Sequence, residues 1–328
     1  MSVPLSILDL APIGEGETAR DAFDASVRLA QRAEAWGYRR IWYAEHHNMT
    51  AIASAATSVL IAHVAAHTQT IRLGAGGVML PNHAPLTIAE QFGTLETLHP
   101  GRIDLGLGRA PGTDQQTFRA LRRDPSAADR FPQDVLELQG YLAGESTVPG
   151  VEAVPGRGTH VPIYILGSSL FGARLAAAFG LPFAFASHFA PQALVDAVAI
   201  YRHEFQPSAH LDRPHVIAGV NVIAADTREA AEEQLLAARR WRAKRLLGRG
   251  RSLSTEEVDA LLASPAGAQV LEMMRYTAVG TSGEVMEDLK RFSDHADADE
   301  LIVVSSAPDK AAALRSLELI AEASGIAS

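Results

Sequence analysis

Residues 299–308 read DELIVVSSAP, and this stretch contains the structural unit that recurs along the chain. Four consecutive apolar residues, LIVV at 301–304, are typical of a parallel strand that is buried on both faces. Two serines and an alanine follow, and Pro308 suits the first turn of a helix because its missing N–H leaves nothing unsatisfied there. The stretch therefore predicts a strand at 301–305 that runs directly into a helix.

Short apolar runs alternate with helical stretches in the same way from the N-terminus onward. The other expected strands cover residues 5–13, 39–47, 71–80, 102–110, 163–167, 183–189 and 216–225. Helical patterns follow them, beginning near residues 21, 54, 85, 133, 169, 191 and 226. Eight strand–helix units in 328 residues favour one closed (β/α)8 barrel over an open sheet, so we expect a single α/β TIM-barrel domain over residues 1–328. Residues 248–280 exceed an ordinary connection, and we expect an insertion there, before the last strand–helix unit.

The composition excludes several classes of protein. The net charge is −9, and the sequence has no basic stripe of the kind that binds nucleic acid, beyond a short run at 239–251. The absence of cysteine rules out disulfides, thiolate zinc sites, iron–sulfur clusters and a cysteine nucleophile. The N-terminus lacks the basic start and apolar core of a signal peptide, and no apolar run reaches roughly 18 residues. We therefore expect a cytoplasmic protein that binds neither nucleic acid nor membrane.

In a barrel of this class the active site lies at the C-terminal ends of the strands, so polar residues there are candidates for chemistry. The strand at 39–47 runs directly into Glu45, His46, His47 and Asn48. Imidazole exchanges protons near neutral pH, as general acid–base catalysis requires. Side chains alternate along a strand, so at most one of His46 and His47 faces the barrel axis. A polar loop whose histidines bind backbone groups is the alternative, and the adjacency of the two histidines argues against a metal site.

Glycines and an arginine mark the next two strand ends. Residues 74–77 read GAGG, which indicates either a bulge or a backbone that a flat ligand ring approaches closely. Arg109 follows GLG at 106–108, but Pro111 stands where a dinucleotide-binding fingerprint needs its third glycine. We therefore interpret Arg109 as a candidate for binding phosphate or carboxylate, with an ordinary salt bridge as the alternative.

The strand at 163–167 ends in Gly167, Ser168 and Ser169, where a helix is expected to begin. Backbone N–H groups at a helix start, two hydroxyls and the helix dipole together favour an anion. Simple helix capping by Ser168 or Ser169 is the alternative. His83 and His188 also follow strands and could line the same mouth of the barrel, although an ordinary polar rim residue is the commoner case.

Three longer motifs complete the pattern: IWYAEHHN at 41–48, PLTIAEQ at 85–91 and LHPGRIDLGLGR at 98–109. The late segments VGT at 279–281 and DELIV at 299–303 follow in the same order. Together these segments resemble the bacterial luciferase-like flavin monooxygenases, and the likeness covers nearly the whole chain. The resemblance implies a (β/α)8 barrel that binds FMN, with the reduced form supplied by a separate flavin reductase. It also implies a homodimer, and a reaction between dioxygen and a small-molecule, carbonyl-type substrate.

The resemblance assigns roles to residues singled out above. His46 matches the family's active-site histidine, to which we assign the proton handling around the flavin and oxygen. Gly76 and Gly77 match a pair that contacts the flavin, often through a cis peptide bond, and Arg109 matches the phosphate-binding arginine. The expected cofactor-binding residues are Gly76, Gly77, Arg109, Gly167, Ser168 and Ser169.

The resemblance also leaves points open. Light-emitting members carry a cysteine where this chain has Gly108, so light emission is doubtful. Relatives often have a third hydroxyl after the serines that bind phosphate, and this chain has Gly172 there. The insertion at 248–280 resembles a mobile lid that closes over the mouth. Two other functions remain as alternatives: a deazaflavin-dependent reductase or dehydrogenase, and a flavin-binding barrel without catalysis.

Overall fold

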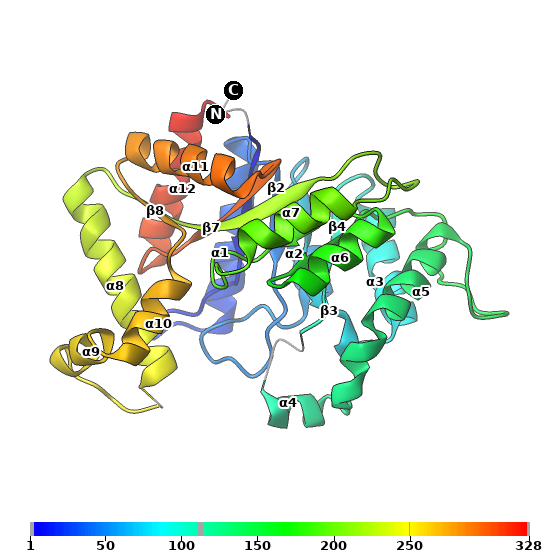
Figure 1. Ribbon diagram of the computed structural model, residues 1–328, viewed down its shortest axis with the longest axis horizontal. Coiled ribbons are helices and arrows are strands. Elements are labelled where there is room, and N and C mark those ends of the chain that lie inside the picture. The colour runs from blue at the N-terminus through cyan, green and yellow to red at the C-terminus, as the bar shows by residue number, and fades with distance from the viewer. Residues whose placement is uncertain (1–2, 111–113, 249, 327–328) are drawn as a thin grey trace.

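The computed structural model describes residues 3–110, 114–248 and 250–326, and its centre is a closed barrel of parallel strands (Figure 1). The barrel strands are β1 (Leu5–Asp9), β2 (Arg40–Tyr43), β3 (Arg72–Met79), β4 (Ile103–Gly108), β5 (Ile163–Gly167), β6 (Phe183–Phe185), β7 (Val216–Ala224) and β9 (Glu300–Ser305). Neighbours pair in the order β6, β5, β4, β3, β2, β1, β9 and β7, and pairing between β6 and β7 closes the ring. The expected (β/α)8 barrel is confirmed.

A further strand, β8 (Thr277–Gly280), pairs with the second half of β7 and was not predicted from the sequence. β6 pairs with β7 only at 216–218, which leaves the edge of β7 at 221–224 open for β8. The sequence of β8 is TAVG, and its residues alternate between half-buried and buried. This strand therefore lacks the continuous apolar run that identifies the other strands, and it lies inside the segment expected to be only an insertion.

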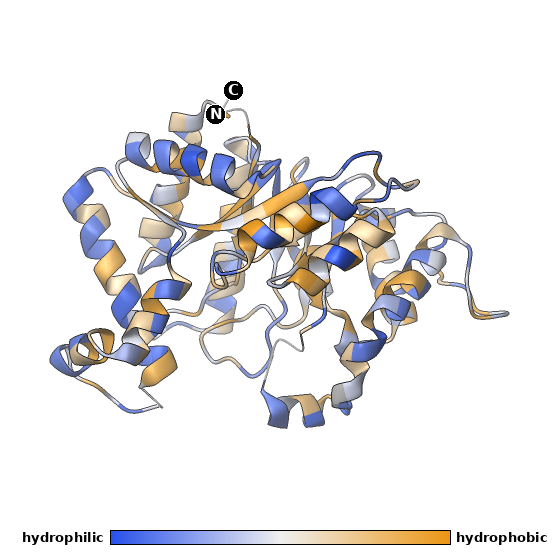
Figure 2. Ribbon diagram, viewed as in Figure 1, coloured by the Kyte–Doolittle hydropathy of each residue, from blue (hydrophilic) through white to orange (hydrophobic). Residues whose placement is uncertain are grey.

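Helices cover the outside of the barrel (Figure 1). The longer ones are α1 (Ala19–Ala35), α2 (Thr57–Ala65), α3 (Pro85–Leu98), α5 (Phe131–Ala143), α6 (Leu170–Phe179), α7 (Leu194–Glu204), α8 (Arg228–Leu247), α11 (Ser282–Ala296) and α12 (Lys310–Ser324). The shorter ones are η1 (Leu80–Asn82), α4 (Gln115–Ala120), η2 (Pro125–Arg130), α9 (Thr255–Leu262) and α10 (Pro265–Met273). α9 and α10 pack against α8 and make up most of the insertion at 248–280. Figure 2 shows β7 in apolar colours, whereas α11 is mostly hydrophilic.

Helix starts follow the sequence signals at two positions and depart from them at one. Capping boxes at Ser254 and Thr281 begin α9 and α11, as the acidic residue three positions later predicts. For α8 the cap is Thr227 rather than Asp226. The Asp226 carboxylate instead binds Arg315, with Oδ1 and Nη2 2.7 Å apart. The cap therefore lies one residue later than the sequence predicted, at a threonine that accepts the Ala230 backbone N–H.

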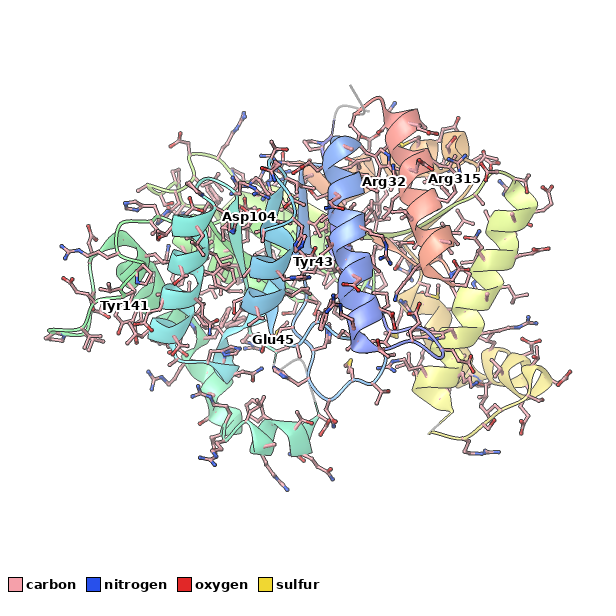
Figure 3. All side chains as sticks on the ribbon, turned by 180° about the vertical axis from the view of Figure 1, so that it is seen from behind. Arg32, Tyr43, Glu45, Asp104, Tyr141 and Arg315 are labelled. Atoms are coloured by element: carbon pink, nitrogen blue, oxygen red, sulfur yellow. The ribbon has the colours of Figure 1, made fainter. Side chains whose placement is uncertain are left out.

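Buried charged and aromatic side chains close the end of the barrel where the strands begin. Asp104 accepts hydrogen bonds from Arg40 Nη1 at 2.8 Å and from Trp42 Nε1 at 3.1 Å. Arg40 also donates to Glu300 at 3.1 Å and to the Tyr164 hydroxyl at 2.7 Å. In Figure 3, seen from behind, Asp104 is labelled above Tyr43 and Glu45 below it. This network fills the floor of the barrel. We call the opposite end, where the strands end, the mouth.

Candidate active site at the barrel mouth

Gly76 and Gly77 are joined by a cis peptide bond and lie at a bulge in β3, where the register with β4 shifts. A Cβ atom on Gly76 would lie 2.8 Å from Trp42 Cβ, and one on Gly77 would lie 2.7 Å from the Gly106 carbonyl oxygen. The protein itself therefore excludes side chains here. The bulge considered as an alternative is present, and so is the cis bond implied by the family resemblance. Contact of these glycines with a flavin remains a prediction.

Glu45, labelled in Figure 3, is a buried residue two positions after β2. Its carboxylate accepts hydrogen bonds from two segments. Its Oε1 atom lies 2.9 Å from Nε2 of both His47 and His83, and 3.0 Å from Asn82 Nδ2. Its Oε2 atom accepts the Met79 backbone N–H at 3.0 Å. Burial alone would raise the pKa of this carboxyl, but the hydrogen bonds from His47, His83 and Asn82 outweigh it and lower the pKa to about 2. The Glu45 carboxylate is thus ionised and fixes the 45–47 segment against η1.

His46 has different surroundings from His47. Its backbone N–H donates to the Ser54 carbonyl at 2.9 Å, and its side-chain Nδ1 atom is buried with no hydrogen-bond partner among the described residues. Burial lowers the pKa of the imidazole below its ordinary value, against the nearby Glu45 carboxylate, which raises it. The ring is therefore neutral at pH 7. A neutral imidazole with an unoccupied nitrogen can accept or donate a proton on a bound molecule.

Arg109 lies over the start of α6. Its guanidinium carbon is 4.1 Å from the ring centroid of Phe171, the second residue of that helix. Ser169 is the N-cap of α6, but its side chain makes no cap hydrogen bond, so the capping alternative is wrong for Ser169. Ser168 and Ser169 are exposed and Gly167 is half-buried. Among the residues that the structure describes, Arg109 forms no ion pair with an acidic side chain. An arginine, two hydroxyls and open backbone N–H groups therefore lie together.

His188 follows β6, and the sequence suggested that it could line the same mouth, with an ordinary rim residue as the commoner case. Its imidazole lies in front of Gly219 in β7, where a Cβ atom would sit 2.5 Å from Nδ1. Ser187 holds this turn by donating from Oγ to the Gly219 carbonyl at 2.6 Å. Burial, with the positive charge of Arg242 and the nearby His46, lowers the pKa of His188 to about 3. The signal that singled it out in the sequence is its place shortly after a strand.

Two further properties follow from the described residues, 3–110, 114–248 and 250–326. No helix in these ranges is long and apolar enough to cross a membrane. They also contain no group of three or more histidine, aspartate or glutamate side chains arranged to hold a metal ion. The mouth thus combines a neutral, buried imidazole, an arginine without an acidic partner among the described residues and glycine-rich backbone.

Comparisons with known proteins agree over nearly the whole chain. A family model described as luciferase-like monooxygenase matches residues 3–298. A protein of Escherichia coli (strain K12) described as a luciferase-like monooxygenase is 49% identical over 321 residues, covering 97% of this chain and 96% of the relative. The N-acetyl-S-alkylcysteine monooxygenase of Bacillus subtilis (strain 168) is 34% identical and covers 98% of both chains. The crystal structure of apo-MsnO8 has a TM-score of 0.89 at 36% identity and covers 99% of both chains.

Proposed function

The chain belongs to the luciferase-like monooxygenase family, and from this premise we propose that it uses reduced FMN and dioxygen to oxidise a small organic, carbonyl-type substrate. The observation that carries the cofactor assignment is the pairing of Arg109 with the start of α6. The guanidinium stands over a helix N-terminus whose N-cap side chain leaves the first N–H groups open. This arrangement suits a phosphate monoester, which is the charged end of FMN.

The residues at the mouth also suit the ring end of FMN, opposite its phosphate. His46 carries a buried nitrogen without a partner, and Gly76 and Gly77 offer backbone without side chains at the same mouth. In the proposed arrangement Arg109, Ser168, Ser169 and the first turn of α6 hold the phosphate. The ring system then extends toward Gly76 and Gly77.

Reduced FMN supplies the electrons that activate dioxygen for transfer of one oxygen atom to the substrate. The chain's own residues handle the proton and position the reacting groups. His46, neutral at pH 7, holds or moves a proton at its unoccupied Nδ1 atom. The ionised Glu45 carboxylate acts indirectly, because it fixes the segment that carries His46 through its bonds to His47 and His83. The closed floor blocks solvent from that end of the barrel, so exclusion of water from the reacting atoms falls to the residues that cover the mouth.

We extend the proposal to the protein's surroundings. A separate flavin reductase supplies the reduced cofactor, the chain works as a homodimer in the cytoplasm, and the insertion at 248–280 acts as a lid over the mouth. The Bacillus subtilis relative is named for N-acetyl-S-alkylcysteine. An S-alkyl compound is therefore the second substrate class to test beside aldehydes and ketones.

Cofactor titration followed by turnover tests the proposal. We expect FMN to bind, and oxygen consumption with reduced FMN to couple to product formation with a member of the aldehyde, ketone or S-alkyl panel. Preferential binding of a deazaflavin, with hydride transfer in the absence of oxygen, would replace the monooxygenase assignment. Binding of FMN without coupled oxidation of any compound in the panel would favour the non-catalytic barrel.

A further inference from the structure

Gly219 leaves a gap in the inner wall of the barrel, in the middle of β7. Ile217, two residues earlier, belongs to the same buried cluster as Trp42 of the floor network. Side chains alternate along a strand, so position 219 also faces the barrel axis. Ile217 is paired with Glu300 of the floor network, and Gly219 with Ile302. Gly219 therefore lies one inward-facing layer closer to the mouth than the floor.

The ring of His188 occupies this gap. A Cβ atom on Gly219 would lie 2.5 Å from His188 Nδ1 and 3.4 Å from Cγ of the same ring. The His188 carbonyl accepts a hydrogen bond from Asn221 Nδ2 at 2.6 Å, and Asn221 Oδ1 in turn accepts one from Ser306 Oγ at 3.0 Å. Ser187 Oγ donates to the Gly219 carbonyl at 2.6 Å. Hydrogen bonds at His188 and at the residue before it thus hold the ring against the inner face of β7.

The two ring nitrogens of His188 have different surroundings. Nδ1 is buried against Gly219 and has no hydrogen-bond partner among the described residues. Burial lowers the pKa of His188 to about 3, so the ring is neutral and carries one proton. A proton on Nδ1 would have no acceptor there, so we assign it to Nε2. Nε2 also has no partner in the part of the chain that the structure describes, but it is not fully buried.

β7 stands opposite β3 in the barrel. The strands β6, β5 and β4 separate them on one side, and β9, β1 and β2 on the other. β3 carries Gly76 and Gly77, beside which we propose that the flavin ring lies. A substrate between that ring and the facing wall would therefore meet His188. Phe189 packs edge-on against His188, with ring centroids 5.0 Å apart, and is 44% exposed, so an apolar surface borders the donor.

We infer that His188 is a substrate-binding residue, whose Nε2–H group donates a hydrogen bond to the carbonyl oxygen of the substrate while the alkyl part of the substrate lies against Phe189. This inference rests on the proposed function and narrows its substrate class. A carbonyl oxygen is a good acceptor for an N–H donor, whereas a thioether sulfur is a weak one. His188 therefore favours aldehydes and ketones over S-alkyl compounds.

Calorimetric titration of the FMN-saturated protein tests this inference with matched pairs of ligands. Each pair is a methyl ketone with a straight alkyl chain, from propyl to octyl, and the methyl sulfide in which sulfur replaces the carbonyl group. His188→Leu removes the donor and is expected to lower the ratio of ketone affinity to sulfide affinity by about fivefold or more, the effect of one lost hydrogen bond. His188→Gln keeps an N–H donor and is expected to restore part of the ratio. His203→Leu, an exposed position on α7, is expected to leave the ratio unchanged.

Two further measurements keep the histidine in place. Gly219→Ala puts a Cβ atom 2.5 Å from His188 Nδ1, so the ring must move, and the affinity ratio is expected to fall as it does in His188→Leu. Nitrogen NMR of the isotope-labelled wild-type protein is expected to show the ring proton on Nε2, with the His188 signals identified by their loss in His188→Gln. A proton on Nδ1 instead of Nε2 overturns the inference.

The outcomes separate this inference from the proposed function. FMN affinity, followed by flavin fluorescence, is expected to be equal in the wild type and all variants. A wild-type protein that binds FMN but none of the ketones overturns the inference alone, and so does an unchanged affinity ratio in His188→Leu or Gly219→Ala. A large loss of FMN affinity in His188→Leu also overturns it, since the ring would then serve the cofactor. Failure of the wild-type protein to bind FMN overturns the proposed function, whichever of the other ligands bind.

Discussion

The guanidinium of Arg109 stacks on Phe171, with its central carbon 4.1 Å from the ring centroid. This contact joins the end of β4 to the first turn of α6, two segments that are far apart in the sequence. It holds a cation over a helix start whose N-cap, Ser169, makes no side-chain cap bond. This arrangement is the basis for the proposed phosphate site, because a cation and a helix N-terminus both favour an anion.

Arg109→Gln is expected to weaken FMN binding by about tenfold or more, because a charge-assisted bidentate contact to phosphate is lost. Riboflavin, which has the same ring but no phosphate, is expected to bind the variant and the wild type equally. Flavin fluorescence titration measures both affinities. Arg119→Gln, an exposed position on α4, is the matched control. If the Arg109→Gln variant lost affinity for FMN and for riboflavin equally, Arg109 would not be the residue that binds the phosphate.

His46→Asn is expected to reduce the rate of oxygen transfer by about 100-fold or more, the range for loss of a general acid–base group, with little change in FMN affinity. Burial lowers the pKa of His46, so the reactive neutral ring persists at pH 7. As the pH is lowered, the wild-type rate is therefore expected to stay constant below the pH at which an exposed histidine protonates. It is expected to fall only at still lower pH. Rapid-mixing kinetics with reduced FMN, carried out over a range of pH values, measure this rate of oxygen transfer. His203→Asn, an exposed histidine on α7, is expected to leave rate and profile unchanged.

Glu45→Gln is expected to destabilise the fold by about 3 kcal/mol at pH 7, because the pKa of Glu45 falls from 4.5 to about 2 on folding. A lowered pKa in the folded state means that the carboxylate stabilises the protein above about pH 4.5. That contribution is lost as the pH falls toward about 2. Urea unfolding at several pH values should therefore show that the difference in unfolding free energy between the variant and the wild type becomes smaller at acidic pH. The exposed Glu15→Gln control is expected to show no such difference.

Asp104→Asn is expected to cost about 3 kcal/mol or more of unfolding free energy, because it leaves the buried Arg40 guanidinium without one of its two anionic partners. Thermal unfolding followed by circular dichroism measures the change. Asp24→Asn removes the exposed partner of Arg20 and is expected to shift the midpoint little. Similar shifts in the two variants would mean that the floor network contributes no more than a surface ion pair.

The barrel could be predicted from the sequence because each of its eight strands is a short apolar run followed by a helical pattern. β8 could not, since four residues with alternating burial give no distinct signal. At the mouth, positions at the strand ends singled out His46, Arg109 and Ser169, whose functional roles remain predictions. Those positions did not identify the hydrogen bond between His83 and Glu45. That contact joins residues 38 positions apart in the sequence and depends on how their two segments pack at the mouth.

A crystal structure of the protein with FMN tests the central claim most directly. We expect the phosphate to lie against Arg109 and the backbone N–H groups at the start of α6, with the ring system beside Gly76 and Gly77 and within reach of His46. FMN bound outside the mouth, or with its phosphate away from Arg109 and its ring away from His46, would overturn the proposed function.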